Sequence, residues 1–476
     1  MAFQRWKDKM TVLEEAACKS AARDEIHEQP FVRNMNNKSN GNSRLSSFQG
    51  QIFRNTMRQK DWLAPLLVTS TLALALVNAI AADWPQWNGP NRDGKSPETG
   101  LLPAWPAGGP KLLWRAAGFG GGYSESSVVG DRLYTMGDKD KAGWVVCASA
   151  DGGKILWATK VGAAGSPFMP EFDYPGPRCT PTVDGNLVFA LDAWGELICL
   201  SSADGKEQWR KHLVKDFGGT PPTWGYSESP LVDGDLVIVT PGGPKGALVA
   251  LNKKTGALIW QSKAFTDPAH YSSIVPAVIE GTRQYVQLTA ASVVGISAKD
   301  GAVLWKATRR GNNAVIPSPI LTGNEVYVTS GYNAGCNRFK VTKAGDKFSV
   351  TQMYANRVMV NQHGGVVQVG DYIYGYCDNQ GLVCQNAKTG SAVWTEGQKT
   401  KKGSVTYADG KLYCREEANG TMILVDAVPG GYAEKGRFAQ PSRAREQAWT
   451  HPVIANGKLY IRDQDLLLCY DISAGK

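Results

Sequence analysis

From residue 110 onward the chain alternates short apolar stretches with turns rich in Gly, Asp and Asn. Residues 227–262 show one complete unit, with apolar stretches at 227–232, 235–240, 246–251 and 257–262. Stretches of this length, bounded by turn sequences such as Val232-Asp233-Gly234, are typical of antiparallel strands joined by tight turns. Four such strands in about 45 residues predict one blade of a β-propeller.

A short motif repeats along the chain and sets the number of units. Each copy places a Gly four residues before a Trp, and a Cys, Ala or Gly ten residues before it. The Gly supplies the positive φ of a tight turn, and the small residue indicates close packing between strands. The copies end at Trp157, Trp209, Trp260, Trp305 and Trp394, with spacings of 52, 51, 45 and 89. The last spacing spans two units, so the unit near 318–354 lacks its Trp.

The two ends of the repeat region complement each other. The chain ends in 468–476 with Cys469 in the small position, but no Trp-bearing strand follows. The sequence of that strand occurs instead at Gly109-Pro-Lys-Leu-Leu-Trp114. We therefore predict an all-β fold over 110–476: an eight-bladed β-propeller of four-stranded antiparallel blades, closed by pairing of N- and C-terminal strands. Such closure leaves no free sheet edge at the junction.

The segment before Ala82 has the order of a secretory signal peptide. A charged stretch follows Met57, residues 62–77 are mostly apolar, and Ala79-Ile80-Ala81 ends the segment. This order predicts a signal peptide over 57–81, cleaved before Ala82 or Asp83. A retained membrane anchor is the alternative, although the apolar stretch is short for a span. No Cys follows the cleavage site to carry a lipid.

Residues 1–56 are polar, rich in Asn and Ser, and without periodicity. We interpret them as a disordered tail or as a mis-called upstream extension of the coding sequence. The formal charge of the whole chain is +9, and residues 82–476 keep 41 basic and 36 acidic side chains, a balance of +5. These charges form no arginine-rich run, so we expect no nucleic-acid partner.

The Gly-x-x-x-Trp repeat resembles the tryptophan-docking motif of the pyrroloquinoline-quinone-like (PQQ-like) repeat family. That family contains quinoprotein dehydrogenases, outer-membrane assembly propellers and secreted bacterial members, and the lead-in at 84–94 is similar to the last group. The resemblance covers about 84–476; residues 82–109 form an N-terminal lead-in segment and 110–476 the propeller. It implies that the docking Trp residues wedge between neighbouring blades; in this chain they are Trp114, Trp157, Trp209, Trp260, Trp305 and Trp394.

The resemblance also raises the question of a bound quinone. Dehydrogenases of this family usually carry two adjacent cysteines above the cofactor, and this sequence has no Cys-Cys pair. It has no Cys-x-x-Cys-His haem motif either. We therefore assign no cofactor and no metal ligand, and keep PQQ with calcium as the alternative. In an oxidising compartment Cys377 and Cys384 could form a hairpin disulfide.

Polar residues recur where the innermost strands begin, near the central funnel. The pentapeptide Gly-Tyr-Ser-Glu-Ser occurs at 122–126 and again at 225–229, so Glu125 and Glu228 hold equivalent positions two blades apart. Arg178 begins the inner strand between them and is the cation expected to compensate their charge. The funnel candidates for ligand binding are Glu125, Arg178, Trp224, Glu228, His270, His363 and His451. The alternative is that these residues bond exposed backbone and line a wet channel.

The leading interpretation is a monomeric extracytoplasmic binding or scaffold module, periplasmic or secreted, with a polar central funnel. Its partner is an unknown protein or small ligand, and it keeps no membrane span after signal cleavage. The alternative is a PQQ-dependent (quinoprotein) alcohol or sugar dehydrogenase with a diverged cofactor site. Motifs of other enzyme classes, such as His-Glu-x-x-His or Gly-x-Ser-x-Gly, are absent from the sequence. Catalytic residues stay unassigned.

Overall fold

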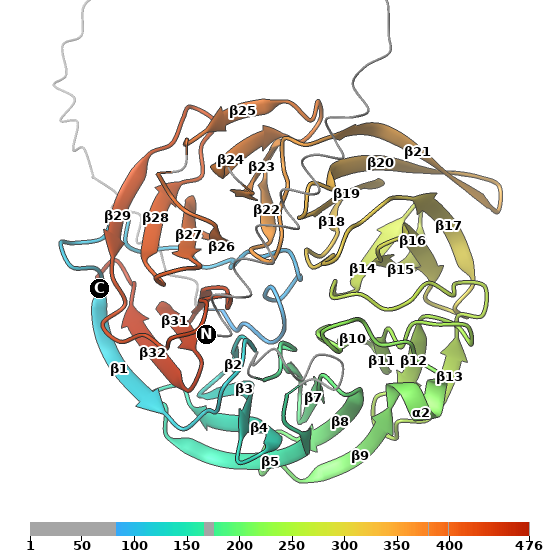
Figure 1. Cartoon of the computed structure of the whole chain (residues 1–476), viewed down its shortest axis with the longest axis horizontal. Coiled ribbons are helices and arrows are strands. Elements are labelled where there is room, and N and C mark those ends of the chain that lie inside the picture. The colour runs from blue at the N-terminus through green and yellow to red at the C-terminus, as the bar shows by residue number, and fades with distance from the viewer. Residues whose placement is uncertain (1–81, 166–175, 379, 398, 476) are drawn as a thin grey trace, which may run out of the picture. The chain divides into compact units, whose positions relative to one another are not determined.

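A computed structural model describes residues 82–165, 176–378, 380–397 and 399–475. The predicted signal peptide and residues 1–56 lie outside the described residues. These described residues form one compact unit. Within it, eight four-stranded antiparallel sheets stand in a ring (Figure 1), which confirms the predicted eight-bladed propeller.

The first four blades follow one another along the chain, and in each the strands run from the axis outward. Their strands are β2 (Ser127–Val129), β3 (Arg132–Lys139), β4 (Ala142–Ser149) and β5 (Ile155–Ala163) in blade 1; β6 (Thr182–Asp184), β7 (Leu187–Leu191), β8 (Glu196–Ser201) and β9 (Glu207–His212) in blade 2; β10 (Leu231–Asp233), β11 (Leu236–Val239), β12 (Val249–Asn252) and β13 (Leu258–Gln261) in blade 3; and β14 (Val275–Ile279), β15 (Thr282–Leu288), β16 (Ser292–Ser297) and β17 (Val303–Thr308) in blade 4.

The next four blades complete the ring. Their strands are β18 (Ile320–Thr322), β19 (Glu325–Ser330), β20 (Gly335–Ala344) and β21 (Lys347–Asn356) in blade 5; β22 (Val366–Val369), β23 (Tyr372–Cys377), β24 (Gly381–Asn386) and β25 (Ala392–Thr395) in blade 6; β26 (Gly403–Ala408), β27 (Lys411–Glu416), β28 (Met422–Asp426) and β29 (Glu434–Phe438) in blade 7; and β30 (Val453–Ala455), β31 (Lys458–Asp463), β32 (Leu466–Asp471) and β1 (Lys111–Ala117) in blade 8. The outer strand β1 pairs with β32, as the closure prediction required.

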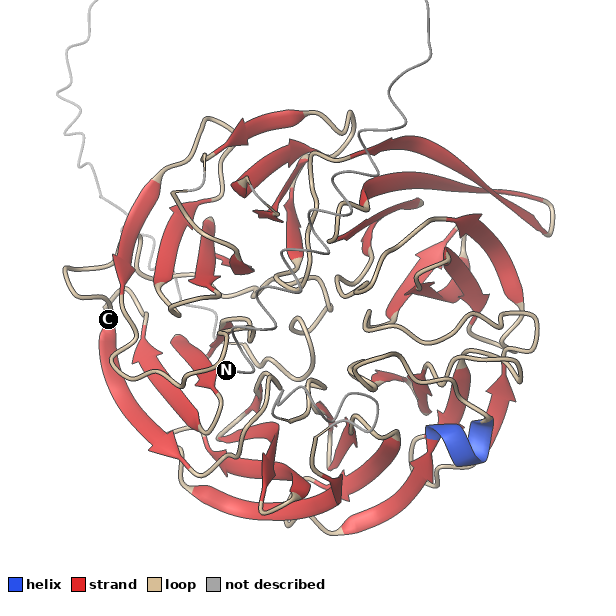
Figure 2. Cartoon of the chain, in the orientation of Figure 1, coloured by secondary structure: helices blue, strands red, loops and turns tan. Residues whose placement is uncertain are grey.

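Helix contributes little to the described part of the chain. It consists of α2 (Leu213–Phe217), which follows the outer strand of blade 2 (Figure 2). No helix of the described residues is long and apolar enough to cross a membrane.

The small position of the repeat lies directly opposite the Trp. In blade 1 Cys147 pairs with Trp157, and in blade 3 Ala250 pairs with Trp260. A β-bulge follows each of these pairs, which turns the outer strand as it passes the neighbouring blade. The thiols of Cys377 and Cys384 are free and buried, so the hairpin disulfide is wrong. The two cysteines pair with Gly381 and Tyr374 respectively, not with each other.

Most of the repeated Trp side chains contact the next blade. The Nε1 of Trp157 donates a hydrogen bond of 3.2 Å to the carbonyl of Ser202 in blade 2. Its ring lies so close to the turn residue Gly205 that a Cβ there would sit 2.5 Å from it. Equivalent Nε1 bonds to a carbonyl of the following blade run from Trp114 to Ala150, Trp209 to Lys253, Trp260 to Ala298 and Trp394 to Val428.

Blades 4 and 5 depart from this pattern. Trp305 bonds within its own blade, donating to the side-chain carbonyl of Gln284 at 2.6 Å. In the next blade β20 and β21 form a long hairpin that turns at Gly345, and its Phe348 and Val350 pack beside the same core cluster as Trp305. In blade 5 the missing Trp is replaced by Tyr354, whose hydroxyl donates to the Ala387 carbonyl of blade 6 at 2.8 Å.

Candidate functional site

The lead-in segment crosses the ends of the inner strands and enters the axis of the ring (Figure 1). Trp84 is fully buried and forms a two-way backbone bridge with Val128 of blade 1. Two blades away in the ring, the Ser96 N–H donates to the Tyr407 carbonyl of blade 7. The segment 84–98 is therefore part of the packed structure, and we call it the axial plug.

Arg92 is the centre of the axial plug. Its guanidinium is buried and donates to the backbone carbonyls of Ser229 at 2.8 Å and Pro230 at 3.2 Å. A third bond, of 3.0 Å, goes to the side-chain carbonyl of Gln86 within the plug. Burial lowers the pKa of Arg92 to about 10, and the nearby Glu228 raises it in part. The side chain thus keeps its charge at neutral pH and ties the plug to blade 3.

Glu228 is buried beside this guanidinium. Burial raises the pKa of its carboxyl to about 8, against smaller lowering effects of the Thr240 hydrogen bond and of Arg92. The compensating cation of Glu228 is therefore Arg92, and the expectation that Arg178 has this role is wrong. The reason is that the plug fills the axis between the blades, which brings its own cation to the carboxyl.

Glu125 occupies the equivalent position in blade 1 but has a different neighbour. Its Oε1 lies 3.4 Å from Nδ1 of His451, whose Nε2 faces the His363 carbonyl at 2.9 Å. Burial raises the pKa of Glu125 well above its usual value and lowers the pKa of His451 to about 4. The imidazole of His451 is therefore neutral at pH 7, and Glu125, when protonated, can donate to its bare Nδ1. The ring of Trp87 packs on His451 at a centroid distance of 4.9 Å.

A second group of side chains belongs to the loops that lead into the inner strands. Tyr123 stands two residues before Glu125 and Trp449 two residues before His451, and their rings contact at 4.6 Å. We call this group the mouth belt; it comprises Tyr123, Arg178, Trp224, His270, Tyr271, His363 and Trp449.

Contacts along the mouth belt link several blades. The guanidinium of Arg178 lies 5.9 Å from the Tyr123 ring centroid and donates to the Trp224 carbonyl at 3.1 Å. The Trp224 ring packs against Tyr271 at 5.7 Å, and the Trp449 ring packs against His363 at 5.7 Å. Arg178, Trp224 and Trp449 are half-buried, so each keeps part of its side chain accessible. Aromatic and arginine side chains held in this state are typical of binding surfaces.

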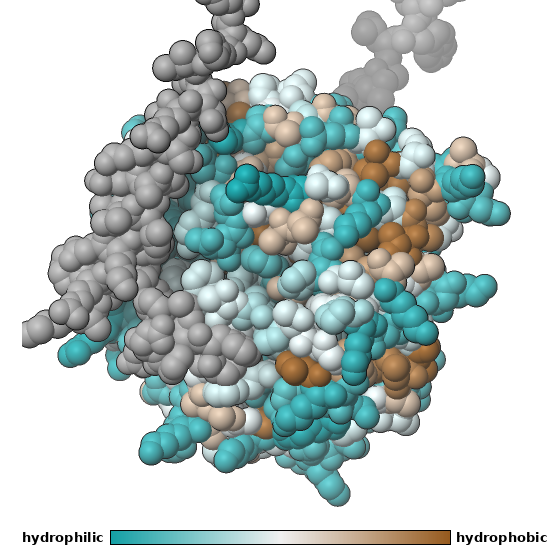
Figure 3. All heavy atoms as spheres, turned by 45° about the vertical axis from the view of Figure 1, so that its right-hand side comes forward, coloured by the Kyte–Doolittle hydropathy of each residue, from teal (hydrophilic) through white to brown (hydrophobic). Residues whose placement is uncertain are grey.

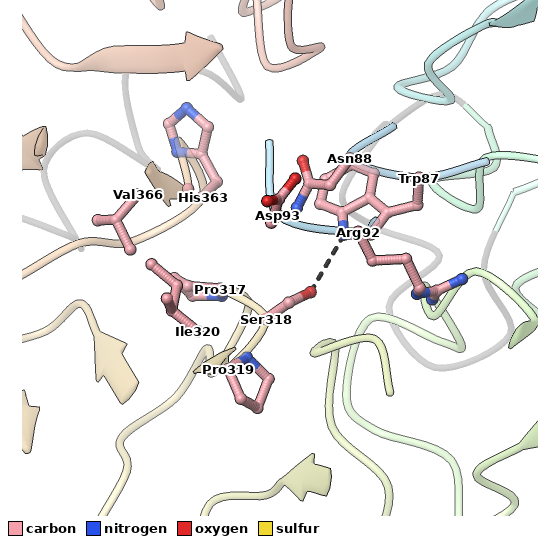
Figure 4. Close-up of a pocket in the computed structure, with 11 residues that line it drawn as sticks. Trp87, Asn88, Arg92, Asp93, Pro317, Ser318, Pro319, Ile320, His363 and Val366 are labelled. Atoms are coloured by element: carbon pink, nitrogen blue, oxygen red, sulfur yellow. Dashed lines mark hydrogen bonds between the residues drawn. The ribbon is translucent and has the colours of Figure 1, made fainter. Parts of the chain in front are cut away.

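Charged groups continue the mouth belt at blades 6 and 7. His363 Nε2 lies 3.7 Å from Glu417, whose carboxylate also lies 3.8 Å from Lys402. Burial and the nearby Lys402 lower the pKa of His363 well below its usual value. Burial likewise lowers the pKa of His270 to about 4, so both imidazoles are neutral at pH 7. Below His363 a small pocket separates the plug residues Trp87 and Asp93 from blades 5 and 6 (Figure 4).

The structure thus sorts the predicted funnel residues into two layers. Glu125, Glu228 and His451 are buried at the level of the plug, whereas Arg178, Trp224, His270 and His363 belong to the mouth belt. Sequence reasoning did not identify Trp87 and Arg92 as site residues. In the structure the Nε1 of Trp87 donates a hydrogen bond of 3.1 Å to the Ser318 hydroxyl (Figure 4). The available signal was an aromatic segment with a lone arginine ahead of the first strand.

These residues do not fit a resident quinone with calcium. Calcium takes six to eight oxygen ligands, including ionised carboxylates. Here Arg92 is the cation that acts on Glu228, Glu125 faces the His451 imidazole, and burial raises the pKa of both carboxyls, that of Glu228 to about 8, which disfavours the ionised form that calcium binds. Among the described residues, no three His, Cys, Asp or Glu side chains are grouped so as to hold a metal ion. We derive no step through either cofactor.

Comparison with known proteins places this architecture in a family. A family model described as outer membrane protein assembly factor BamB matches residues 141–396, more than half of the chain. The chain belongs to this family of PQQ-like repeat propellers. The assembly factor BamB of Shewanella oneidensis is 23% identical over 254 residues, which cover 51% of this chain and 60% of the relative. The chain thus spans less than two thirds of that relative's length.

The chain is also similar to quinohemoprotein dehydrogenases. Quinohemoprotein alcohol dehydrogenase ADH IIB of Pseudomonas putida is 32% identical over 133 residues, 27% of this chain and 19% of that protein. Among solved structures, BamB of Moraxella catarrhalis has a TM-score of 0.54 at 15% identity, covering 77% of this chain and 98% of the other. Quinohemoprotein alcohol dehydrogenase of Comamonas testosteroni has the same TM-score at 11% identity, with coverages of 83% and 81%. These structural likenesses show the fold alone.

Proposed function

We propose that this protein is an extracytoplasmic binding module that holds a protein partner at its mouth belt. The observation that carries the proposal is the belt itself: Arg178, Trp224 and Trp449 are half-buried and fixed by contacts across the blades. A rigid aromatic and arginine surface loses little entropy on binding, which favours recognition of another surface. The export signal predicted at 57–81 supports an extracytoplasmic location.

The axial plug gives the mouth belt a solid floor. Because Trp87 packs on His451, two residues after Trp449 of the belt, a partner side chain entering the belt meets a packed aromatic layer. The partner class also draws support from the relatives, several of which are named as outer-membrane assembly factors. We propose a protein partner on these two grounds, and a monomeric protein in the absence of that partner.

Site-specific photo-crosslinking tests this proposal. A photo-reactive phenylalanine analogue replaces Trp224 in the full chain, expressed in its native host. The matched control replaces Ile259, which is 53% exposed on the outer strand β13 and does not belong to the mouth belt. We expect a discrete adduct from position 224 that is lost when Arg178→Ala is added. Equal adducts from both positions, or none from 224, contradict the proposal.

The quinoprotein alternative has a separate test. Purified protein receives pyrroloquinoline quinone and Ca²⁺, and dye reduction is followed with alcohols and sugars as substrates. We expect no saturable quinone binding, because Arg92 and its hydrogen bonds fill the axis beside Glu228. Saturable binding with dye reduction favours the dehydrogenase instead.

A further inference from the structure

The carboxyl group of Glu98 lies at the end of the axial plug and is almost fully buried, with 1% of the residue exposed. It accepts backbone hydrogen bonds from Asn456 and from Gly457, the latter at 2.9 Å, at the β30–β31 turn of blade 8. Burial raises the pKa of Glu98, and these backbone N–H groups lower it in part. Among the described residues, no lysine, arginine or histidine forms an ion pair with this carboxylate.

A further donor to Glu98 is the backbone nitrogen of Ala82, at 2.9 Å from Oε1. Ala82 is half-buried and directly follows Ala79-Ile80-Ala81, the small-x-small sequence of the predicted signal-peptide cleavage site. The nitrogen that cleavage would set free is therefore the one that the buried carboxyl already holds.

We propose that cleavage between Ala81 and Ala82 creates an N-terminal ammonium that pairs with Glu98 and locks the axial plug onto blade 8. An endopeptidase adds water across the Ala81–Ala82 peptide bond. The carbonyl carbon of Ala81 gains the hydroxyl as a carboxylic acid, and the Ala82 nitrogen becomes an amine. At neutral pH that amine takes up a proton, so the neutral amide donor becomes a cation.

This change strengthens an existing contact instead of building a new one. Hydrogen bonds between two charged groups are shorter and roughly twice as strong as neutral ones. A carboxylate that has lacked a cation gains one without any movement of blade 8, because Asn456 and Gly457 keep their bonds to it. The new ion pair holds one end of the axial plug, whose centre is Arg92. Signal-peptide cleavage and the attachment of the plug in the axis are therefore coupled.

The test compares two chains that differ by one charge. Both begin at Ala82, and one is acetylated at its N-terminus; the acetylated nitrogen still has an N–H for Glu98 but no charge. A chain that begins at Ala82 contains the axial plug and all the strands of the eight blades. We expect the free-amine chain to have an unfolding equilibrium constant about tenfold smaller at pH 7. The same acetylation of a Glu98→Gln chain is the matched control and should change the constant less than twofold.

The pH dependence gives a second measurement that a purely structural role of Glu98 would not produce. Pairing raises the pKa of the ammonium above its ordinary value of about 7.7–8.0. The advantage of the free-amine chain is therefore complete at pH 7 and disappears as the pH rises through the raised pKa. Equal stability of the acetylated and free-amine chains at pH 7, or an advantage that persists at high pH, overturns the lock.

The proposal rests on the export stated above, and the two can fail separately. Mass spectrometry of protein exported by the native host should find Ala82 as the first residue. Another N-terminus overturns processing at this bond, whatever the partner of the mouth belt is. The acetylation comparison uses chains that were never exported, so its failure overturns the lock and leaves export standing.

Discussion

Replacing Glu228 by Gln should remove a pH dependence of stability that its buried carboxyl creates. Burial raises the pKa of Glu228 to about 8, whereas an unfolded glutamate titrates near its ordinary value. Between these values the folded chain holds a proton that the unfolded chain has released, so stability falls as the pH rises. Gln keeps the acceptor for the Thr240 N–H and cannot titrate.

The magnitude follows from the two pKa values. A group of this kind lowers the free energy of unfolding by up to about 1.4 kcal/mol per pH unit, and between pH 6.5 and 8 its total is about 2 kcal/mol. Below pH 6.5 the buried imidazoles act in the opposite direction, because burial lowers the pKa of His270 and of His451 to about 4. Burial also raises the pKa of Asp192 to about 7, so within the window from 6.5 to 8 the effect of Glu228 is read from the difference between variant and wild type.

Urea unfolding followed by tryptophan fluorescence measures this effect. Wild type, Glu228→Gln and the control Glu207→Gln, which changes an exposed carboxyl on β9, are each unfolded at pH 6.5, 7.2 and 8.0. We expect the variant to gain about 2 kcal/mol relative to wild type across the window, and the control to run parallel to wild type. A Glu228→Gln curve that also runs parallel would refute a protonated carboxyl beside Arg92.

Three further changes test the packing around the ring. Arg92→Ala should lower the free energy of unfolding by about 3–5 kcal/mol in urea, since it strips the partners from the Ser229 and Pro230 carbonyls; a loss no larger than that of exposed Arg115→Ala contradicts the plug. Tyr354→Phe should cost about 1 kcal/mol by removing the bond to Ala387, and Tyr354→Trp should be tolerated better than Tyr354→Ala; equal losses for all three would show that the ring is not held there. The thiols of residues 82–476 are buried, and burial raises the pKa of Cys179 to about 12, so a thiol reagent should label them only after denaturation; rapid labelling of the native protein is inconsistent with this packing.

The repeat made the fold predictable because its signals are local. A Gly four residues before a Trp fixes a turn and the strand after it, and the small residue opposite the Trp sets the register of the hairpin. The split of the motif between Trp114 and Cys469 even predicted the closing pair, which the structure forms. Each of these signals lies within a few residues or repeats at a fixed period.

The axial plug could not be predicted in this way. Arg92 bonds to residues more than 130 positions away, and the Glu98 carboxyl reaches a turn more than 350 positions away. The lead-in has no periodic pattern that would indicate these contacts, because its Gly, Asn and Pro residues form irregular turns. Glu125 illustrates the same limit: its strand position was predictable, but its partner His451 lies in the neighbouring blade 8, more than 320 residues later in the sequence.

Surface composition alone does not point to the mouth belt either. Large exposed apolar side chains occur mainly on outer strands, such as Leu258 and Ile259 on β13 and Met353 on β21. On the face in Figure 3 apolar side chains lie in separate groups among polar ones. The belt is distinguished instead by half-buried aromatic rings linked to Arg178 across several blades.

The central claim, that the mouth belt binds a protein partner, is tested most directly by an affinity measurement. The partner identified by crosslinking is purified and titrated against wild type, against the double variant Arg178→Ala, Trp224→Ala, and against Ile259→Ala on the outer strand. Because arginine and tryptophan side chains dominate binding energies, we expect the double variant to raise Kd at least about a hundredfold and the Ile259 variant less than about threefold. An unchanged Kd for the double variant, with its circular dichroism and melting temperature preserved, would contradict the account.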